Sequence, residues 1–282
     1  MTAAARPDAL KALETAAGGA GANDSLGDAF LRDGYVIRPA EDRDALLRIQ
    51  RYMADSAAES LGMALPADPT RFLDEIGKHV RPDGLNAFRL HVINRLNEAD
   101  WARQAYFGLA RRTIESIIGN ELAMQRNFAL SIQLPEDDSS LLPTHADVWS
   151  ECSPFEMVLW TPFVDCFATK SMFVLPLAES RAVTKRLADF ERSGVEGLFH
   201  AIEDRVQWLD IPFGSFLLFN PSLIHGNRVN HERTTRWSIN CRFKGLFTPY
   251  SDKRLGGFFD VLSMRPATRM ALSYKLPGGF DD

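Results

Sequence analysis

The chain has 282 residues, of which 45% are hydrophobic and 10% aromatic, and this is the balance of a globular protein with a sizeable core. The formal net charge of −5 and the sequence pI near 5.7 give no basic stripe, so nucleic acid is not an expected partner. An anionic small-molecule substrate stays open, because local Lys and Arg residues can override the global sign.

Residues 1–25 are expected to form a loosely ordered leader, because they are rich in Ala and Gly and lack the apolar stretch of a signal peptide. Every apolar run is shorter than the roughly 18 residues that a membrane span needs, so we expect no membrane partner. The 3 cysteines are too few and too scattered for a disulfide framework or a zinc site, and they fit a reducing cytoplasm. We therefore expect a cytoplasmic protein in which residues 26–282 form a single domain. The sequence gives no oligomeric state.

Helices are expected first along the chain, over a supporting region at 41–119. Apolar residues at helical spacing predict one helix over 41–63, which downstream prolines end. Residues 86–119 are predicted to be mostly helical, as two helices broken near 97–100, and Asp100 is placed to cap the second.

Strands dominate the next region, a predicted β core at 127–247, and helices interrupt it only over 180–192 and 195–204. This order is typical of a mainly β fold with flanking helices, a double-stranded β-helix or jelly roll backed by N-terminal helices. Residues 248–282 are expected as a tail that could cover the mouth of the barrel or a partner subunit. The predicted strands are 127–134, 155–165, 171–177, 206–211, 215–219 and 236–246.

The tripeptide His145-Ala146-Asp147 is a candidate metal site. With 6 His and 37 acidic residues, a His followed two positions later by Asp or Glu is expected by chance about once in such a chain, so the tripeptide alone is weak. In an extended segment, residues i and i+2 point to the same face, so His145 and Asp147 can bind one ion. The apolar run 128–134 and the proline-containing loop after it predict that the pair lies at the end of a short strand, where substrate can reach it.

His225 is the candidate third ligand. It follows an apolar run that Asn220-Pro221 ends, and Gly226 lets the backbone come close to a neighbour or a metal. Two imidazoles and one carboxylate form the three-point facial site typical of non-haem Fe(II). The other four histidines have no partner at ligand spacing and are expected to be ordinary hydrogen-bonded or solvated residues.

A strand with a polar face begins at Arg236, where Arg236, Ser238, Asn240 and Arg242 alternate with apolar residues. The polar face could meet water, or it could line a pocket while the apolar face packs under helices. The segment 127–134 has the same alternation, and two such strands flanking the metal motif favour the pocket. Arg236 can hold a carboxylate with two parallel N–H bonds, and Ser238 adds a donor on the same face.

The order His145-x-Asp147, His225, Arg236-x-Ser238 resembles the Fe(II)/2-oxoglutarate dioxygenases, and most closely their phytanoyl-CoA dioxygenase-like branch. Within that branch, three segments are similar to the oxygenases of streptomycin-type and other carbohydrate biosynthesis clusters. These segments are Leu142–Ser150, Ser153–Glu156 and Thr169–Met172.

The resemblance covers residues 120–245 and departs from the family at one place. Many members of the branch have a Gly-rich turn that ends in Pro-Gly-Ser-His, where this chain reads Leu175-Pro176-Leu177-Ala178-Glu179-Ser180. The substrate contacts of those relatives are therefore not transferred to this chain.

The resemblance implies a reaction. His145, Asp147 and His225 would hold Fe(II), and 2-oxoglutarate would bind through its keto-acid end with its far carboxylate on Arg236 and Ser238, leaving one position for O2. Decarboxylation to succinate and CO2 produces an oxidant that removes a hydrogen atom from a substrate, with hydroxylation as the default outcome and desaturation, epimerisation or ring closure as others. Related halogenases replace the carboxylate ligand with a small residue, so the presence of an Asp argues against halogenation. The implied substrate is a sugar, an aminocyclitol or a nucleotide sugar.

Five further residues near the motif are candidate substrate contacts, each with an ordinary alternative. A Trp two positions beyond the metal motif could stack on a ring but is more often a core residue, and a turn lysine is usually solvated. The arginine is the preferred second anion contact, because it shares the predicted pocket face and would be costly if buried alone. These candidates are Gln133, Trp149, Trp160, Lys170 and Arg242.

Two other functions remain open from the residues alone. A metal-dependent cupin-type isomerase or hydrolase on the same fold would use a similar ligand set but would not need Arg236 and Ser238 at that offset. A non-catalytic jelly-roll binding protein would need neither set.

Overall fold

The computed structural model describes residues 25–275, so the predicted leader lies outside the described residues except for its last position. Seven strands form a main antiparallel sheet in the order β1-β7-β4-β9-β2-β10, and β3 also pairs with β9. A second antiparallel sheet has the order β6-β5-β8. The strands of the main sheet are β1 (Tyr35–Pro39), β2 (Leu122–Gln125), β3 (Ala129–Gln133), β4 (Glu156–Pro162), β7 (Ser215–Phe219), β9 (Arg236–Gly245) and β10 (Phe259–Ser263), and those of the second are β5 (Phe173–Val174), β6 (Gln207–Trp208) and β8 (His225–Gly226).

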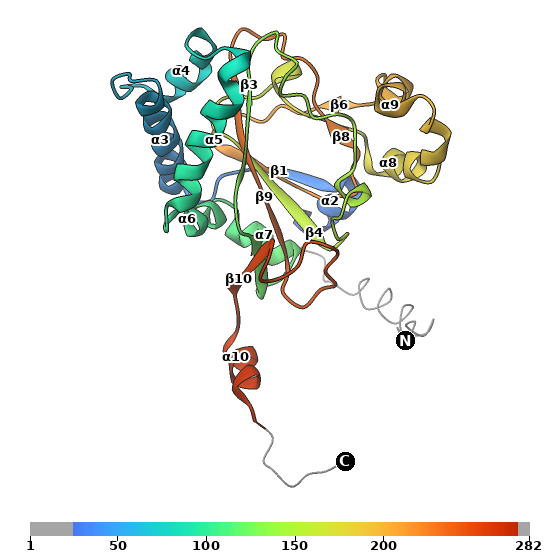
Figure 1. Ribbon diagram of the computed structural model, residues 1–282. Coiled ribbons are helices and arrows are strands. Elements are labelled where there is room, and N and C mark those ends of the chain that lie inside the picture. The colour runs from blue at the N-terminus through green and yellow to red at the C-terminus, as the bar shows by residue number, and fades with distance from the viewer. Residues whose placement is uncertain (1–24, 276–282) are drawn as a thin grey trace.

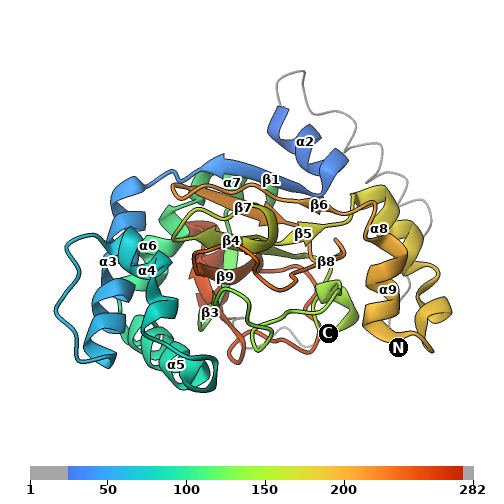
Figure 2. The same ribbon diagram turned by 90° about the horizontal axis from the view of Figure 1, so that it is seen from above.

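Helices flank the sheets on two sides. Helices α3 to α6 gather on one side of the main sheet, whereas α8 and α9 lie on the opposite side of the molecule, beyond the second sheet (Figures 1 and 2). Asp42 is the N-cap residue of helix α3, and its carboxylate accepts a hydrogen bond from the backbone N–H of Ala45 at 2.9 Å. The helices are α2 (Ser25–Asp33), α3 (Arg43–Ser60), α4 (Pro69–Asp74), α5 (Pro82–Glu98), α6 (Ala102–Gly108), α7 (Arg111–Ile117), α8 (Leu177–Thr184), α9 (Gly194–Ile202) and α10 (Pro266–Ser273).

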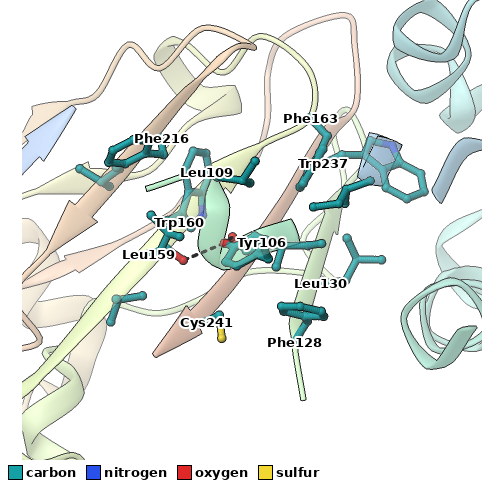
Figure 3. Packing of buried hydrophobic residues seen from close by; sticks show 14 of the residues in the cluster. Tyr106, Leu109, Phe128, Leu130, Leu159, Trp160, Phe163, Phe216, Trp237 and Cys241 are labelled. Atoms are coloured by element: carbon teal, nitrogen blue, oxygen red, sulfur yellow. Dashed lines mark hydrogen bonds between the residues drawn. The ribbon is translucent and has the colours of Figure 1, made fainter. Parts of the chain in front are cut away.

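The apolar face of β9 packs beneath the first group of helices. The indole N–H of Trp237 donates to the carbonyl of Leu73 in α4 at 2.9 Å. Tyr106 of α6 lies among these core residues (Figure 3). Its hydroxyl is 2.9 Å from the carbonyl oxygens of Leu159 and Ile239, either of which can accept the hydrogen bond that it donates. Because strand residues alternate in direction, this packing turns the polar face of β9 toward the interior.

The polar face of β9 is buried at Arg236 and Ser238 and partly exposed at Asn240 and Arg242. Arg236 is 3% exposed and Ser238 1% exposed, which confirms that this face lines the interior. The antiparallel sheets with flanking helices confirm the coarser part of the predicted fold, a β core backed by helices.

The predicted helices over 86–119 differ from the structure in number and in their cap. Three helices, α5, α6 and α7, occupy this region, where two were predicted. Asp100 does not cap the second one, because α6 has Trp101 at its N-cap position and no side-chain cap hydrogen bond. Burial of Tyr106 and Phe107 against the sheet fixes α6 instead, so tertiary packing overrides the local capping signal.

Two predicted strands are much shorter than expected. The strands predicted at 171–177 and 206–211 have only two residues each, as β5 and β6. Pro176 takes the N-cap position of α8 and ends the first. In the second, Ile211 lies outside β6 and forms an isolated bridge with Cys166.

The C-terminal region adds a strand to the main sheet, which the sequence reading missed. Strand β10 pairs with β2, while β1, also unpredicted, pairs with β7 at the other end of the strand order. Helix α10 lies away from the body of the molecule (Figure 1) and has no buried residue. No residue of 248–275 lines the cavity described below, so this part of the tail does not cover its mouth.

Between residues 25 and 275, no helix is both long and apolar enough to cross a membrane.

Candidate metal centre and cavity

The structure brings His145, Asp147 and His225 together, although 80 residues separate the two histidines. One potential ligand atom from each lies within 4.8 Å of the others. The backbones of the two histidines form an antiparallel bridge, with N···O distances of 2.9 and 2.8 Å. Since His225 belongs to β8, His145 extends the second sheet by one strand position.

Asp147 reaches this cluster from a turn. Ala146 is extended, with φ −119° and ψ 136°, but a 3₁₀ helix, η2 (Asp147–Trp149), begins directly after it. The N–H of Val148 donates to the carbonyl of Pro221 at 3.2 Å, which attaches the turn to the loop after β7. The motif therefore lies at the end of an extended segment, as expected: His145 forms a bridge, Ala146 is extended, and the backbone turns at Asp147.

Backbone carbonyls fix the orientation of both imidazoles. Nδ1 of His145 lies 2.8 Å from the carbonyl oxygen of Pro143, and Nδ1 of His225 lies 2.9 Å from that of Leu223. A carbonyl can only accept, so each Nδ1 carries the proton and each Nε2 keeps its lone pair for a metal. This is the arrangement in which metal-binding histidines are usually held.

The protonation states of these groups suit a cation. Burial, aided by the neighbouring His145, lowers the pKa of His225 to about 4, so its imidazole is neutral near pH 7. Burial alone would raise the pKa of Asp147, but the neighbouring histidines and the charge of Arg242, which donates to its carboxylate, hold it well below its usual range. A neutral imidazole and an ionised carboxylate are the forms that bind metals.

Arg236 is a buried guanidinium with neutral partners. Its Nη1 donates to the carbonyl of Ser171 at 3.2 Å and its Nη2 to the hydroxyl of Ser131 at 2.9 Å. Nε of Arg236 and the hydroxyl of Ser238 are buried without a hydrogen-bond partner in the described part of the chain. Burial lowers the pKa of Arg236 to about 10, so the group remains charged at pH 7. A buried cation with unused donors requires an anion from outside the described residues.

A cavity of about 460 Å³ opens beside these groups. Three of the candidate site residues, His225, Arg236 and Trp160, line it. Its polar wall comes from α5, β3, β9, the loop around 139–142, and β8 with the residue that follows it, and its apolar wall comes largely from neighbouring strands and helices. The polar members are Asn86, Arg89, Ser131, Ser139, Ser140, Asn227 and Asn240, and the apolar members include Leu85, Leu130, Leu142, Met172 and Phe219.

Arg242 belongs to an ion-pair network and does not line this cavity. Its Nη2 donates to Oδ1 of Asp147 at 2.7 Å, and its Nε lies 3.8 Å from Oε2 of the fully buried Glu156. The arginine proposed from the sequence as a second anion contact thus already has two anions of the protein itself.

The other three candidate substrate contacts also lie outside the cavity lining. Lys170 is 1% exposed, and its ammonium donates to the carboxylate of Asp74 at 2.6 Å and to the hydroxyl of Thr234 at 2.7 Å, so it forms an internal ion pair. Gln133 is fully buried, and its amide nitrogen donates to a backbone carbonyl. Trp149 is half-buried and packs against the small apolar cluster around α8 and α9, and none of the described residues accepts a hydrogen bond from its indole N–H.

Several residues of the site escaped sequence analysis. Asn86 and Arg89 reach the cavity from α5, and no local pattern predicts this because the contact depends on how the helix packs on β3. Ser131 had a signal, since it lies on the predicted polar face of β3. Gly226 allows the close approach predicted for it: an added Cβ would lie 3.0 Å from the carbonyl oxygen of Leu142.

No protein-family model matches the chain, and no curated protein sequence matches it. Its fold is similar to that of EctD from S. alaskensis, solved with 2-oxoglutarate and 5-hydroxyectoine, at a TM-score of 0.52 and 16% identity over 82% of this chain and 80% of that one. It is also similar to the apo form of ThoJ, a non-heme monooxygenase, at a TM-score of 0.50 and 13% identity over 78% and 77% of the two chains. EvdMO1 has a TM-score of 0.52 and 13% identity over 79% of this chain and half of its own length. At such identities the likeness concerns the fold.

Proposed function

We propose that this protein is an Fe(II)- and 2-oxoglutarate-dependent oxygenase that hydroxylates a small polar metabolite, such as a sugar, an aminocyclitol or a nucleotide sugar, with release of succinate and CO2. One observation carries the proposal: a three-residue metal site and a buried guanidinium without a carboxylate partner in residues 25–275 adjoin one cavity, which His225 and Arg236 both line. A metal site alone would fit many enzymes. The added anion site is what points to a dicarboxylate co-substrate.

The donor set of the metal site fits Fe(II). His145 and His225 offer imidazole Nε2 atoms whose rings are held by backbone carbonyls, and Asp147 offers an ionised carboxylate. Two imidazoles and one carboxylate on one side of an ion are typical of non-haem iron oxygenases, because the remaining positions stay free for ligands. These three residues would hold the iron.

The β9 face fits the far carboxylate of 2-oxoglutarate. Nε of Arg236 and the hydroxyl of Ser238 are unused buried donors on this face, and Ser131 and Ser171 hold the guanidinium of Arg236 in place. Bound together, Fe(II), 2-oxoglutarate and O2 supply an oxidant that removes a hydrogen atom from a substrate C–H bond. The apolar wall of the cavity, including Trp160, limits the access of water to this region.

The polar part of the cavity wall supports a polar substrate. Asn86 and Arg89 on α5 face the same space as Ser139, Ser140 and Asn227. Amide and hydroxyl groups of this kind bind hydroxyl and amino groups of a ligand, and an arginine at the rim can bind an anionic group.

The finer assignments of fold and location belong to the same proposal. We assign the two sheets to the halves of a double-stranded β-helix, supported by the bridge between His145 and His225, which widens the second sheet, and by the likeness to EctD at a TM-score of 0.52. We further propose a single-domain enzyme of the cytoplasm, in keeping with three free, buried cysteines.

An anaerobic titration tests the co-substrate directly. Fe(II) and 2-oxoglutarate added to the wild-type protein should give a visible charge-transfer band, because the keto-acid end of 2-oxoglutarate chelates iron. Asp147→Ala should abolish the band through loss of a metal ligand. If wild type gives no band while it binds Fe(II), a metal-dependent isomerase or hydrolase is the better assignment; if it binds no metal, a non-catalytic binding protein is.

Turnover is tested by measuring succinate with O2, Fe(II), 2-oxoglutarate and ascorbate, over a panel of sugars, aminocyclitols and nucleotide sugars. A true substrate should raise the rate of succinate release above the substrate-free background, and should appear as an oxidised product by mass spectrometry. Equal background rates for wild type and Asp147→Ala over the whole panel would contradict the proposed activity.

A further inference from the structure

We propose that Arg242 is a positioning residue that holds the carboxylate of Asp147 in the orientation needed to bind the metal; this inference rests on the metal site proposed above. The two groups meet at 2.7 Å between Arg242 Nη2 and Asp147 Oδ1, and their side chains are only 14% and 8% exposed. A charge-assisted hydrogen bond with so little access to water is short and directional.

Each of the three metal-ligand candidates has one partner that fixes its orientation. For His145 it is the carbonyl of Pro143 and for His225 that of Leu223. Asp147 begins the 3₁₀ helix η2, and within residues 25–275 the hydrogen bond to its carboxylate comes from the guanidinium of Arg242. Arg242 therefore supplies for the carboxylate what backbone carbonyls supply for the imidazoles.

Arg242 also contacts residues other than Asp147. Its backbone N–H donates to the side-chain oxygen of Gln125 at 3.1 Å, and its Nε lies 3.8 Å from Oε2 of Glu156. Glu156 is 0% exposed, and its other oxygen accepts the N–H of Ser153 at 2.9 Å. The network thus runs from the backbone of Ser153 through Glu156 and Arg242 to Asp147. Its Glu156–Arg242 step is an ion pair without a hydrogen bond, since Nε of Arg242 and Oε2 of Glu156 have no hydrogen-bond partner among the described residues.

Contact with a substrate is the alternative role for Arg242, and the groups around its side chain argue against that role. The residue does not line the cavity, and two carboxylates already neutralise its charge. Arg236, on the same face of β9, has no carboxylate partner in the described part of the chain and lines the cavity. The two arginines are therefore assigned different roles: Arg236 for an external anion, Arg242 for the metal ligand.

The test measures the affinity of the full-length protein for Mn(II), using the EPR signal of the free ion. Arg242→Gln alone would leave Glu156 buried with no cation beside it at this position, so Arg242→Gln is combined with Glu156→Gln and compared with Glu156→Gln as its parent. Loss of a residue that orients a metal ligand typically weakens metal binding about 10- to 100-fold, and we expect this range. A dissociation constant within about 3-fold of the parent would overturn the proposal.

Two further measurements separate positioning from a general loss of structure. The visible spectrum of bound Co(II) should change between parent and double variant, because the carboxylate is no longer fixed. Arg242→Lys keeps a cation between the two carboxylates but reaches less far, so it should bind Mn(II) several-fold more weakly than wild type. If the double variant does not fold, this lysine variant decides the matter, and an unchanged Mn(II) affinity overturns the proposal.

Failure of this inference can be told apart from failure of the proposed function. Mn(II) binding that depends on Asp147 but not on Arg242 would refute the positioning role and leave the oxygenase intact. Mn(II) binding that depends on both, without any charge-transfer band from Fe(II) and 2-oxoglutarate, would support the positioning role and refute the oxygenase.

Discussion

Two arginines on one face of β9, six positions apart, have opposite surroundings. Arg236 is buried among a serine hydroxyl and a backbone carbonyl, whereas Arg242, whose side chain is 14% exposed, lies between the carboxylates of Asp147 and Glu156. A buried cation is costly unless it is paired, so the unpaired arginine indicates an external anion and the paired one indicates an internal network. The ionic partners of each arginine thus distinguish the residue that we assign to an external anion from the one that we assign to the metal ligand, even though both have the same place in the sequence pattern.

The largest expected effect is on folding, at Arg242. Arg242→Met removes the cation that Asp147 and Glu156 share, and breaking a buried ion pair by removing one partner typically costs about 3–5 kcal/mol. Urea unfolding of the metal-free protein should show a loss of this size. The matched control is Arg236→Met, which should be near neutral or slightly stabilising, because it removes a buried charge without leaving a carboxylate unpaired. Equal losses in both variants would erase the distinction between the two arginines.

The second expected effect is on 2-oxoglutarate binding, where substitution of Arg236 should have the larger effect and substitution of Arg242 the smaller. Arg236→Met should weaken 2-oxoglutarate binding by about 2–5 kcal/mol, tens- to thousands-fold, because a charged hydrogen-bonded contact is lost. The charge-transfer band should still appear at high 2-oxoglutarate concentration, since the iron ligands are intact. An unchanged dissociation constant would move the anion site away from Arg236. The control is the Arg242→Lys variant measured at saturating Fe(II), where the 2-oxoglutarate constant should change by less than about 3-fold.

The pattern that identified β9 in the sequence also explains why the two arginines could not be told apart there. Alternation places Arg236, Ser238, Asn240 and Arg242 on one face, and the structure confirms that this face is turned inward. The partners of each arginine come from segments remote in sequence, such as Asp147, 95 positions before Arg242. Local periodicity determines which way a side chain points, but only the tertiary packing determines what it meets.

The same limit explains the other differences between expectation and structure. Lys170 was predicted either to contact the substrate or to be solvated in a turn. In the structure it pairs with Asp74, which lies 96 positions away on α4. Strands β5 and β8 have two residues each, too few for any periodic signal, although β8 contains His225. Longer elements with regular alternation or helical spacing, such as α3, β4 and β9, were predictable nearly in full.

A third ion pair, exposed at the edge of the main sheet, gives a smaller effect that depends on pH. Asp260 on β10 accepts hydrogen bonds from Arg126 and Arg103, and its side chain is 32% exposed. Its pKa is lowered to about 2, and the largest cause is the hydrogen bond from Arg126. A lowered carboxyl pKa adds stability above the unfolded pKa of about 4, and this contribution is lost as the pH falls through the folded value. After discounting for solvent screening, Asp260→Asn should cost about 1 kcal/mol at pH 7.

The control for this pair is the pH and salt dependence of the loss. The difference between wild type and Asp260→Asn should vanish between about pH 4 and pH 2, and should shrink in 1 M salt. The loss caused by Arg242→Met should persist in 1 M salt, because Asp147 is only 8% exposed. A loss at Asp260 that is the same at pH 7 and pH 2 would show that the pair contributes nothing through its charge.

The smallest expected effect is at Arg89, which extends the comparison to an arginine at the cavity rim. Its guanidinium donates to the side chain of Asn86 at 2.6 Å and to the carbonyl of Leu130 at 3.2 Å, and it forms no ion pair within residues 25–275. Because the residue is partly exposed, Arg89→Ala should change stability by less than about 0.5 kcal/mol and leave 2-oxoglutarate affinity within about 2-fold of wild type. Substrates with a phosphate or carboxylate should lose affinity in this variant, while neutral sugars should not. Equal losses for both kinds of substrate would assign Arg89 to the shape of the rim and leave Arg236 as the single anion-binding arginine that we assign to this cavity.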